Sequence, residues 1–298
     1  MAHFGWPSAF YVPAVAALVW SFLWWYLVAD TPQEHKTISE AERAYILGAI
    51  GDKVTKSKAM PPFKSIATSL PFLAMTVLHF GSCWGLYFIL TAGPMFVKNV
   101  LGFDIKAAGV LSAFPYLARA IFSVLFGAIA DFIMGKKIWS TTFIRKFFCL
   151  FSHIIPGTLL LFLVSAGCNW PISIGLLTMS MGCNGAATLT NLQNHQDLAP
   201  NYAGTLYGIA NSVGSIAGFV SPMITGYFTD KGHTFENWGP IFNCGAAAYI
   251  GAAVFFIVFG TGNIQKWNYR NQPPPPATGL AAWAPWGKAA TPPSPTKK

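Results

Sequence analysis

Residues 111–137 read LSAFPYLARAIFSVLFGAIADFIMGKK, an apolar run that contains one arginine and ends on two lysines. From residue 106 to residue 130 the chain is long enough to cross a bilayer as one helix. A charge near the middle of such a span costs at least about 2.5–3.5 kcal/mol on insertion scales. Arg119 therefore faces either a water-filled solute pathway or an acidic partner on another helix, and the sequence leaves both interpretations open. The pathway interpretation is favoured by a polar stripe at helical spacing: Ser112, Tyr116, Arg119, Ser123 and Gly127.

The composition is that of a membrane protein. The 298 residues are 53% hydrophobic and 10% charged, with a mean hydropathy of +0.46, whereas soluble domains carry about 25% charged residues. We therefore predict a multi-pass protein embedded in the lipid bilayer, without a separate soluble domain. The net charge of +9 lies in loops between apolar spans, which argues against nucleic acid as a partner. The five cysteines show no metal-binding or disulfide spacing, so no metal or other cofactor is expected.

Seven apolar spans are predicted, with a polar loop after the first and a short polar link after the fifth. In the loop, Ser39 followed by Glu42 indicates a capping box at the start of a surface helix. The tail is rich in proline, alanine and glycine and has few side chains that could be buried, so we expect it to be disordered. The predicted spans are residues 8–28, 70–97, 106–130, 143–165, 172–190, 203–228 and 240–260. The predicted divisions are a first helix at 1–29, a loop at 30–69, a six-helix bundle at 70–262 and the tail at 263–298.

Basic residues are distributed unequally over the two sides of this topology. One side carries 15 of the 19 lysine and arginine residues and the other side carries three, with Arg119 inside the membrane. The side rich in positive charge is expected to be cytoplasmic. This places the C-terminus in the cytoplasm and, with seven spans, the N-terminus on the opposite side.

Two further spans carry patterned polar faces. The second places Thr76, His79, Cys83, Tyr87 and Thr91 on one face, with Trp84 beside it. We interpret Trp84 and Tyr87 as walls of the pathway, and His79 as either a hydrogen-bonded structural residue or a proton-linked one. The sixth span carries a small-residue stripe, in which the glycines indicate close helix packing. Within the stripe, Asn211 and Ser215 could also contact a solute. Its members are Gly204, Gly208, Asn211, Ser215, Gly218, Pro222 and Thr225.

Motifs of common enzyme classes are missing. The sequence contains no helical HExxH motif and no nucleophile elbow. Gly135-Lys136 resembles the end of a phosphate-binding loop, but Ala130 stands where that loop needs glycine and Lys137 stands where it needs serine or threonine. We do not expect an enzyme.

The segment Gly127-x-x-x-Asp131 followed by Gly135-Lys136-Lys137 resembles the cytoplasmic loop motif of the major facilitator superfamily, with one additional residue between Asp131 and Gly135. A basic loop held by an aspartate at a helix end can change partners as two helical bundles move. On this resemblance we interpret four residues as cytoplasmic gate residues: Asp131, Lys136, Lys137 and Asp197.

More specific segments resemble the solute carrier 17 family of anion transporters, over residues 1–267. The branch that carries glutamate into vesicles has an arginine where this chain has Ser82, and the chain is most similar to the inorganic phosphate cotransporters. The segments are Leu101-Gly102-Phe103-Asp104-Ile105, Gly109 to Leu117, Ser140 to Lys146, Asn194 to Pro200, Tyr202-Ala203-Gly204, Asn211 to Gly218 and Gln265-Lys266-Trp267.

The resemblance implies an all-α fold of twelve spans in two halves with the solute between them. This chain would supply helices six to twelve, either because the gene model is partial or because the chain is a truncated isoform. The function implied is secondary active transport of a small inorganic or organic anion, phosphate favoured, coupled to Na⁺ or H⁺. The membrane could be the plasma membrane or that of a vesicle or lysosome. The alternative is a fragment that does not transport and that acts as a partner or regulator of a full-length carrier. The expected anion-binding residues are Arg119, Tyr116, Trp84, Tyr87 and Asn211.

Overall fold

The computed structural model describes residues 5–50, 60–136, 138–167 and 169–269. Of its two compact units, the first holds α1 (Ser8–Leu27) and α2 (Glu40–Ile50), and the second holds every later helix. The apolar side chains of α1 are exposed, as expected for a helix that faces lipid. At the start of α2, the Ser39 hydroxyl accepts a hydrogen bond from the Glu42 backbone N–H at 3.2 Å. The predicted start of this surface helix is confirmed.

The second unit is built from helices, and the part of it that the structure describes contains no strand. Several helices begin at a capping side chain, for example Asp104, which accepts a hydrogen bond from the Ala107 N–H at 2.7 Å. Short π-helical and 3₁₀ turns join some of the helices: η2 (Leu150–Ile154), η3 (Gly185–Leu189), η4 (Pro200–Tyr202) and η5 (Lys266–Tyr269). The helices are α3 (Phe63–Ala67), α4 (Leu70–Thr91), α5 (Gly93–Asn99), α6 (Ile105–Leu111), α7 (Phe114–Gly135), α8 (Thr141–Cys149), α9 (Ile155–Ser165), α10 (Trp170–Asn184), α11 (Asn191–Leu198), α12 (Ala203–Thr229) and α13 (Phe235–Phe259).

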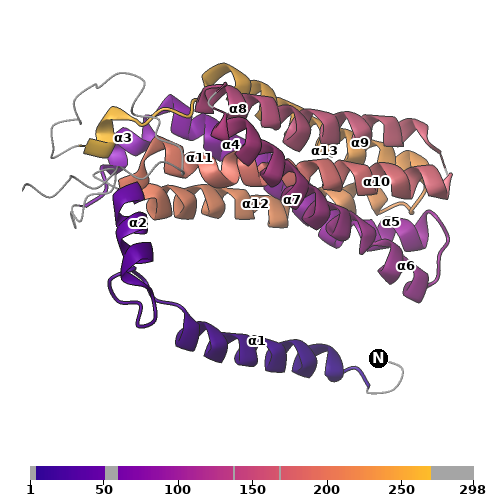
Figure 1. Cartoon of the computed structure of the whole chain (residues 1–298). Coiled ribbons are helices and arrows are strands. Elements are labelled where there is room, and N and C mark those ends of the chain that lie inside the picture. Colours follow the sequence, from indigo (N-terminus) through magenta and orange to yellow (C-terminus); the bar gives the residue numbers. More distant parts are fainter. Residues whose placement is uncertain (1–4, 51–59, 137, 168, 270–298) are drawn as a thin grey trace, which may run out of the picture. The chain divides into compact units, whose positions relative to one another are not determined.

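The long helices of the second unit pack side by side (Figure 1). α4 lies between α12 and α13, and α9 lies between α13 and α10. α7 packs on α10 and on the η3 turn. The packing order is thus α7, α10, α9, α13, α4, α12, so that α7 and α12 stand at its two ends. The residues that the sequence analysis singled out for anion binding lie on α4, α7 and α12.

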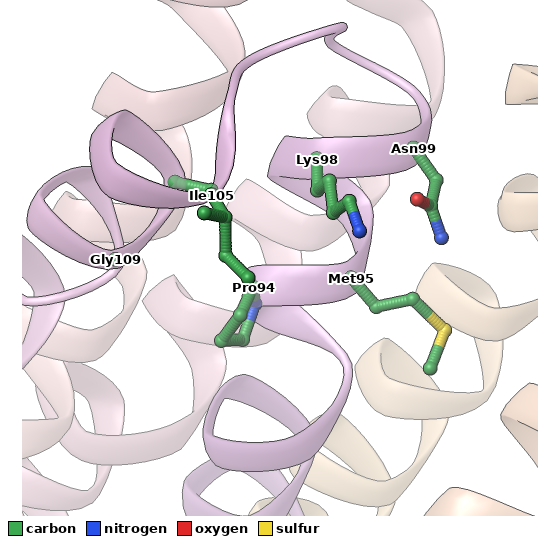
Figure 2. A pocket seen from close by; sticks show the side chains of 7 residues that line it. Pro94, Met95, Lys98, Asn99, Ile105 and Gly109 are labelled. Carbon is green, nitrogen blue, oxygen red and sulfur yellow. The ribbon is translucent and has the colours of Figure 1, made fainter. Parts of the chain in front are cut away.

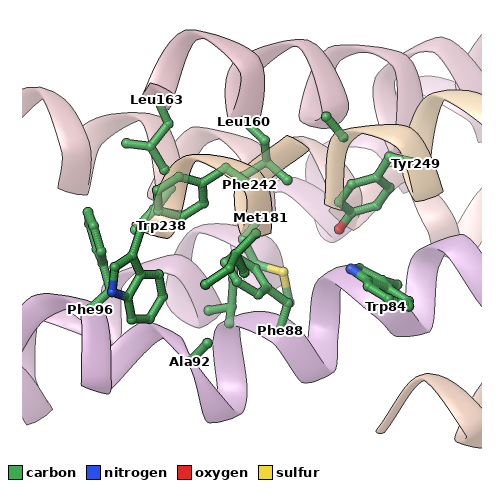
Figure 3. Close-up of a cluster of buried hydrophobic side chains, with 14 of the residues drawn as sticks. Trp84, Phe88, Ala92, Phe96, Leu160, Leu163, Met181, Trp238, Phe242 and Tyr249 are labelled. Atoms are coloured by element: carbon green, nitrogen blue, oxygen red, sulfur yellow. The ribbon is translucent and has the colours of Figure 1, made fainter. Parts of the chain in front are cut away.

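An aromatic cluster, which also contains aliphatic side chains, packs α4 and α5 against α9, α10, α12 and α13 (Figure 3). The ring of Phe96 packs 5.1 Å from both Trp238 and Phe242, measured between ring centroids. Phe88 meets Phe242 edge-on at 5.8 Å, a geometry that aromatic pairs prefer. Two further clusters lie around Phe72, Leu206 and Phe256, and around Ile144 and Phe148. The apolar core therefore holds α4 firmly against α13.

Six helical segments among the described residues are long and apolar enough to cross a membrane. They correspond to six of the seven predicted spans: Ser8–Leu27, Leu70–Asn99, Ile105–Gly135, Thr141–Ser165, Trp170–Leu198 and Phe235–Phe259. The remaining predicted span is α12, which at 27 residues is long enough but is less apolar, because glycine, serine, threonine and asparagine make up much of it. The chain is a multi-pass membrane protein, with α12 as its most polar long helix.

The third span is not one regular helix from residue 106 to residue 130. α6 ends at Leu111 and α7 begins at Phe114, with Pro115 in the first turn of α7. Proline has no N–H to donate, and it restricts the residue before it, so the helical hydrogen-bond ladder is interrupted there. Ser112 therefore belongs to the kink, and the straight polar face begins only at Tyr116.

The predicted polar link at residues 191–202 is also different in the structure. Residues 191–198 form helix α11, and four of its residues are buried: Asn191, Asn194, His195 and Leu198. Their polar composition indicated a link between spans, but some of their buried polar groups have partners: Asn191 Nδ2 donates to His79 of α4, and Asn194 Nδ2 donates to Asp197 and to the Thr261 carbonyl.

The small-residue stripe of α12 packs differently from the prediction. Gly204 and Gly208 border open space, so their predicted packing role finds no partner in the described part of the chain. Gly218 does pack closely, since a Cβ there would lie 3.2 Å from the ring of Tyr87. Gly214, outside the predicted stripe, faces α4: a Cβ there would lie 2.8 Å from Cys83 Sγ and 2.9 Å from His79 Cδ2. Close approach of α12 to α4 thus depends on Gly214 and Gly218.

Replacing Gly214 by alanine is expected to lower the free energy of unfolding by about 1–3 kcal/mol, because the added methyl group overpacks the contact with α4. Gly208→Ala is the matched control. It borders open space in the same helix, so it is expected to be neutral or to stabilise by up to about 1 kcal/mol. Thermal unfolding of the purified variants in detergent measures the difference. Equal melting temperatures would show that the α4–α12 contact tolerates a larger side chain.

Candidate functional site

Arg119 lies on α7 and is partly exposed. No carboxylate lies within ion-pair distance of it among the described residues, where the ion pairs are Arg43–Glu40 and Arg145–Asp197. Tyr116, which lies one turn before it on the same helix, packs against the buried cluster that contains Trp84 of α4. Of the two interpretations of Arg119, the structural ion pair finds no partner in the described part of the chain.

Tyr116 and Trp84 both contribute to the aromatic cluster. Trp84 belongs to its buried core and is 7% exposed, while Tyr116 is half-buried and packs against it. The Tyr116 hydroxyl is buried and has no hydrogen-bond partner among the described residues. Trp84 therefore belongs to the packed core, which the predicted role as a pathway wall did not lead us to expect. The Tyr116 hydroxyl, in contrast, is a hydrogen-bond donor without an acceptor in the described part of the chain.

Tyr87 and Asn211 lie at the contact between α4 and α12. Tyr87 is half-buried with its ring against Gly218. Asn211 is exposed on α12, and its Oδ1 accepts a hydrogen bond from His79 Nε2 at 3.4 Å. The structure thus brings the predicted residues of the second and sixth spans together, and it links Asn211 to His79.

His79 is 3% exposed and has partners at both ring nitrogens. Besides the bond to Asn211, its Nδ1 accepts from Asn191 Nδ2 at 2.9 Å, and the Thr190 hydroxyl donates to Asn191 Oδ1 at 3.1 Å. The rings of His79 and Tyr207 meet edge-on at 5.8 Å. This arrangement fits a neutral imidazole with its proton on Nε2. The proton-linked role of His79 stays a prediction.

A second set of buried polar side chains, which the sequence did not reveal, surrounds the η2 turn. The imidazole of His153 is fully buried, bonded to the Ser152 hydroxyl at 2.7 Å and to the Leu78 carbonyl of α4 at 2.9 Å. Pro156 cannot donate to the Ser152 carbonyl four residues earlier, and Asn184 Nδ2 donates to that carbonyl at 2.8 Å. A proline after a lone histidine in an apolar run was the only local signal. The partners come from distant helices.

The four predicted gate residues have separate environments. Asp131 is exposed, and the Lys136 ammonium lies 4.4 Å above the ring of Phe132. Lys137 lies outside the described residues. Asp197 accepts two hydrogen bonds from the guanidinium of Arg145, at 2.7 Å and 3.1 Å. The structure does not join Asp131 and Lys136 to Asp197, so a common gate stays a prediction.

Arg145, one of the basic residues that the sequence assigns to the cytoplasmic side, is buried. Its side chain is 5% exposed, and its third hydrogen bond goes to the Leu189 carbonyl at 2.8 Å. Asn194 Nδ2 joins the pair by donating to Asp197 at 3.3 Å and to the Thr261 carbonyl at 2.8 Å. This cluster ties α8 to α11 and to the segment that follows α13.

The first residues of the predicted disordered tail are ordered. Gln265 N–H donates to the Leu198 carbonyl at 2.8 Å, and Asn268 Oδ1 accepts from the Asn201 N–H at 3.1 Å. Asn268 is 2% exposed. Residues 263–269 therefore pack against the bundle, which corrects the tail boundary, and residues 270–298 lie outside the described residues.

A separate cavity of about 380 Å³ lies between α5 and α6 (Figure 2). None of the predicted anion-binding residues lines it, and Lys98 is its one charged lining residue. The described residues also contain no cluster of histidine, cysteine and carboxylate side chains that could hold a metal ion. The candidate site is therefore the group around Arg119 on α7 and α4.

Comparison with known proteins agrees with this arrangement. The family model of the Major Facilitator Superfamily matches residues 1–222. The chain belongs to the Major Facilitator Superfamily.

Its relatives lie within one branch of that superfamily. The chain is 35% identical to human sialin over 265 residues, which are 89% of this chain and 53% of sialin. It is 36% identical to human vesicular glutamate transporter 2 over 267 residues, 88% of this chain and 46% of that protein. It is 35% identical to a Drosophila melanogaster protein that carries the name inorganic phosphate cotransporter, over 89% of this chain and 50% of that protein. The predicted resemblance to solute carrier family 17 is confirmed, and the chain spans about half the length of these relatives.

Proposed function

We propose that this chain forms part of a secondary active transporter that moves an inorganic or organic anion, with phosphate favoured, coupled to Na⁺ or H⁺. The observation that carries the proposal is Arg119, a partly exposed cation in a membrane span with no ion-pair partner in the described part of the chain. A permanent charge at that depth usually serves a solute path. The names of two relatives refer to glutamate and to inorganic phosphate, which are both anions at neutral pH.

The chemistry of the side chains supports an anion as the solute. A guanidinium offers a planar fork of N–H donors that matches phosphate or carboxylate. The Tyr116 hydroxyl, one turn away, has no hydrogen-bond partner in the described part of the chain. Ser82 of α4 is buried and accepts a hydrogen bond from Asn184 Nδ2 at 3.3 Å. It adds no second positive charge to the site. One cation with neutral donors favours a small anion such as phosphate.

Location and orientation are part of the same proposal. The distribution of basic residues supports a cytoplasmic C-terminus, and the membrane is that of the cell surface, a vesicle or a lysosome. Transport through a bilayer needs no bound cofactor beyond the co-transported ion, so we propose a carrier and not an enzyme.

Binding and uptake by the purified chain test the proposal. Saturable binding of radiolabelled phosphate, competed by unlabelled phosphate, is the expected result in detergent. Vesicles that contain the chain are then loaded under an imposed Na⁺ or proton gradient, with protein-free vesicles as control and with labelled N-acetylneuraminate and glutamate as other solutes. Absence of saturable binding for all three anions would contradict the proposal.

A second candidate function is a non-transporting partner or regulator of a full-length carrier. The exposed polar residues of α12, among them Asn211, Ser212 and Ser215, favour it, since polar groups in a membrane need a covering surface. Co-purification of the tagged chain with a co-expressed carrier of the same family would support this function. Recovery of a stable monomer without that carrier would contradict it.

A further inference from the structure

His79 of α4 connects a buried polar group to an exposed residue of α12. Its imidazole is 3% exposed, yet Nε2 donates a hydrogen bond to Oδ1 of the exposed Asn211 at 3.4 Å. On the other side of the ring, Nδ1 accepts from Asn191 Nδ2 of α11 at 2.9 Å. Both partners are amides, which present either an acceptor oxygen or donor N–H groups. The surroundings of the ring can therefore satisfy it in both of its protonation states.

Asn191 has the partners that a change of protonation state requires. The Thr190 hydroxyl donates to Asn191 Oδ1 at 3.1 Å, and the Ala187 carbonyl oxygen lies 3.4 Å from the same hydroxyl. When the amide turns over, its Oδ1 accepts from a protonated Nδ1 of His79, and its Nδ2 donates to the Thr190 hydroxyl. That hydroxyl then donates to the Ala187 carbonyl. Each of these polar groups keeps a partner, so a proton can be added at Nδ1 without leaving a buried donor unpaired.

Other titratable side chains face the same contact between α4, α11 and α12. Cys83 lies beside Gly214, the ring of Tyr207 lies 5.8 Å from that of His79, and the ring of His195 lies 5.3 Å from that of Tyr207. Among these types of side chain, histidine is the one that ordinarily gains a charge between about pH 5 and 8. His195 Nδ1 is buried without a partner in the described part of the chain, whereas both ring nitrogens of His79 are paired. A second N–H is thus accommodated at His79 and not at His195.

The remaining titratable and charged groups near α4 are committed to other partners. His153 of η2 is bonded to the Ser152 hydroxyl and to the Leu78 carbonyl, and its ring packs on Tyr249 of α13. On α11, Asp197 is paired with Arg145. His79 is the histidine among them whose hydrogen-bond partner is a predicted anion-binding residue, Asn211.

We propose that His79 binds the co-transported proton at Nδ1, with Asn191 as the positioning residue whose amide turns over to accept it. A charged imidazole is costly in a buried site unless another charge compensates it. An anion that accepts a hydrogen bond from the Asn211 amide supplies that charge, so the proton and the anion each raise the affinity for the other. The inference rests on the proposed function and deepens it, because it makes the coupling ion a proton.

The pH dependence of phosphate binding in His79→Gln tests the inference. Glutamine keeps a neutral hydrogen-bonding side chain that cannot gain a charge. The Kd for labelled inorganic phosphate is measured for the wild type and the variant in detergent at each pH, and the ratio of the two values removes the titration of phosphate itself. The ratio of variant to wild type is expected to rise as the pH falls, by up to about tenfold per pH unit, the limit for one linked proton. A constant ratio, with phosphate bound by both chains, would overturn the inference and leave the proposed function standing.

Asn191→Asp is a second variant, with nearly the same shape, in which a carboxylate accepts from Nδ1 and keeps His79 charged. The pH profile of phosphate affinity is expected to move upward by about 1–3 pH units, as for an ionisable group beside an opposite charge. A purely structural role for Asn191 would change the melting temperature and leave the profile in place. Should His79→Gln fail to fold, a wild-type pH profile in Asn191→Asp would overturn the inference.

His195→Gln is the matched control, because the ring of His195 also contacts Tyr207. It is expected to keep the pH dependence of the wild type. Loss of that dependence in His195→Gln, together with its retention in His79→Gln, would place the proton on α11 and overturn the inference. A wild-type chain that binds no phosphate, N-acetylneuraminate or glutamate at any pH would overturn both the inference and the proposed function.

Discussion

Replacing Arg119 by alanine is expected to weaken phosphate binding at least about 100-fold while the protein still folds. Two charge-assisted hydrogen bonds from one guanidinium contribute roughly 3 kcal/mol or more, and each 1.4 kcal/mol is a factor of ten in affinity. Saturation binding of labelled phosphate to the purified variant measures the loss, and uptake into vesicles is expected to fall with it.

Stability separates the two interpretations of Arg119. Because the described part of the chain gives Arg119 no ion-pair partner, its removal leaves no carboxylate uncompensated, and the melting temperature is expected to be unchanged or higher. Arg119→Lys keeps the charge but loses the planar fork, so it is expected to retain part of the binding. A variant that unfolds, or one that binds phosphate as the wild type does, would contradict the anion-binding role.

The sequence predicts the helical spans well because a bilayer imposes a simple requirement of about 20 apolar residues. It also places Tyr116 and Arg119 on one face of α7, since both lie beyond the Pro115 kink. The kink itself could have been expected from the proline, which starts the helix anew at Phe114. α12 was also predicted as a span, although it is less apolar than the other long helices.

What the sequence could not predict depends on contacts between residues far apart in the chain. The bond between His79 and Asn191 joins residues 112 positions apart, and no local pattern indicates it. The polar composition of residues 191–198 indicated a link, because hydropathy cannot distinguish exposed polar groups from buried ones that have partners.

Arg145→Ala is expected to destabilise the protein strongly, by about 3–5 kcal/mol. The change leaves Asp197 as a largely buried charge without its partner, and it leaves the Leu189 carbonyl without its donor. The exposed ion pair Arg43–Glu40 is the matched control, because its glutamate side chain is 83% exposed. Arg43→Ala is expected to change stability by less than about 1 kcal/mol. Thermal unfolding in detergent, with loss of helical signal as the readout, measures both variants.

A double variant distinguishes the loss of a partner from the loss of the pair itself. Arg145→Met with Asp197→Leu removes both charges, so no unpaired ion stays buried, and replacing a buried pair by apolar residues is often neutral or stabilising. The double variant is therefore expected to recover part of the stability that Arg145→Ala loses. Phosphate binding in the double variant then reports on the gate hypothesis for Asp197. If binding is retained but uptake is lost, the ion pair acts in the conformational change, whereas retention of both would limit it to holding α8, α11 and the segment after α13 together.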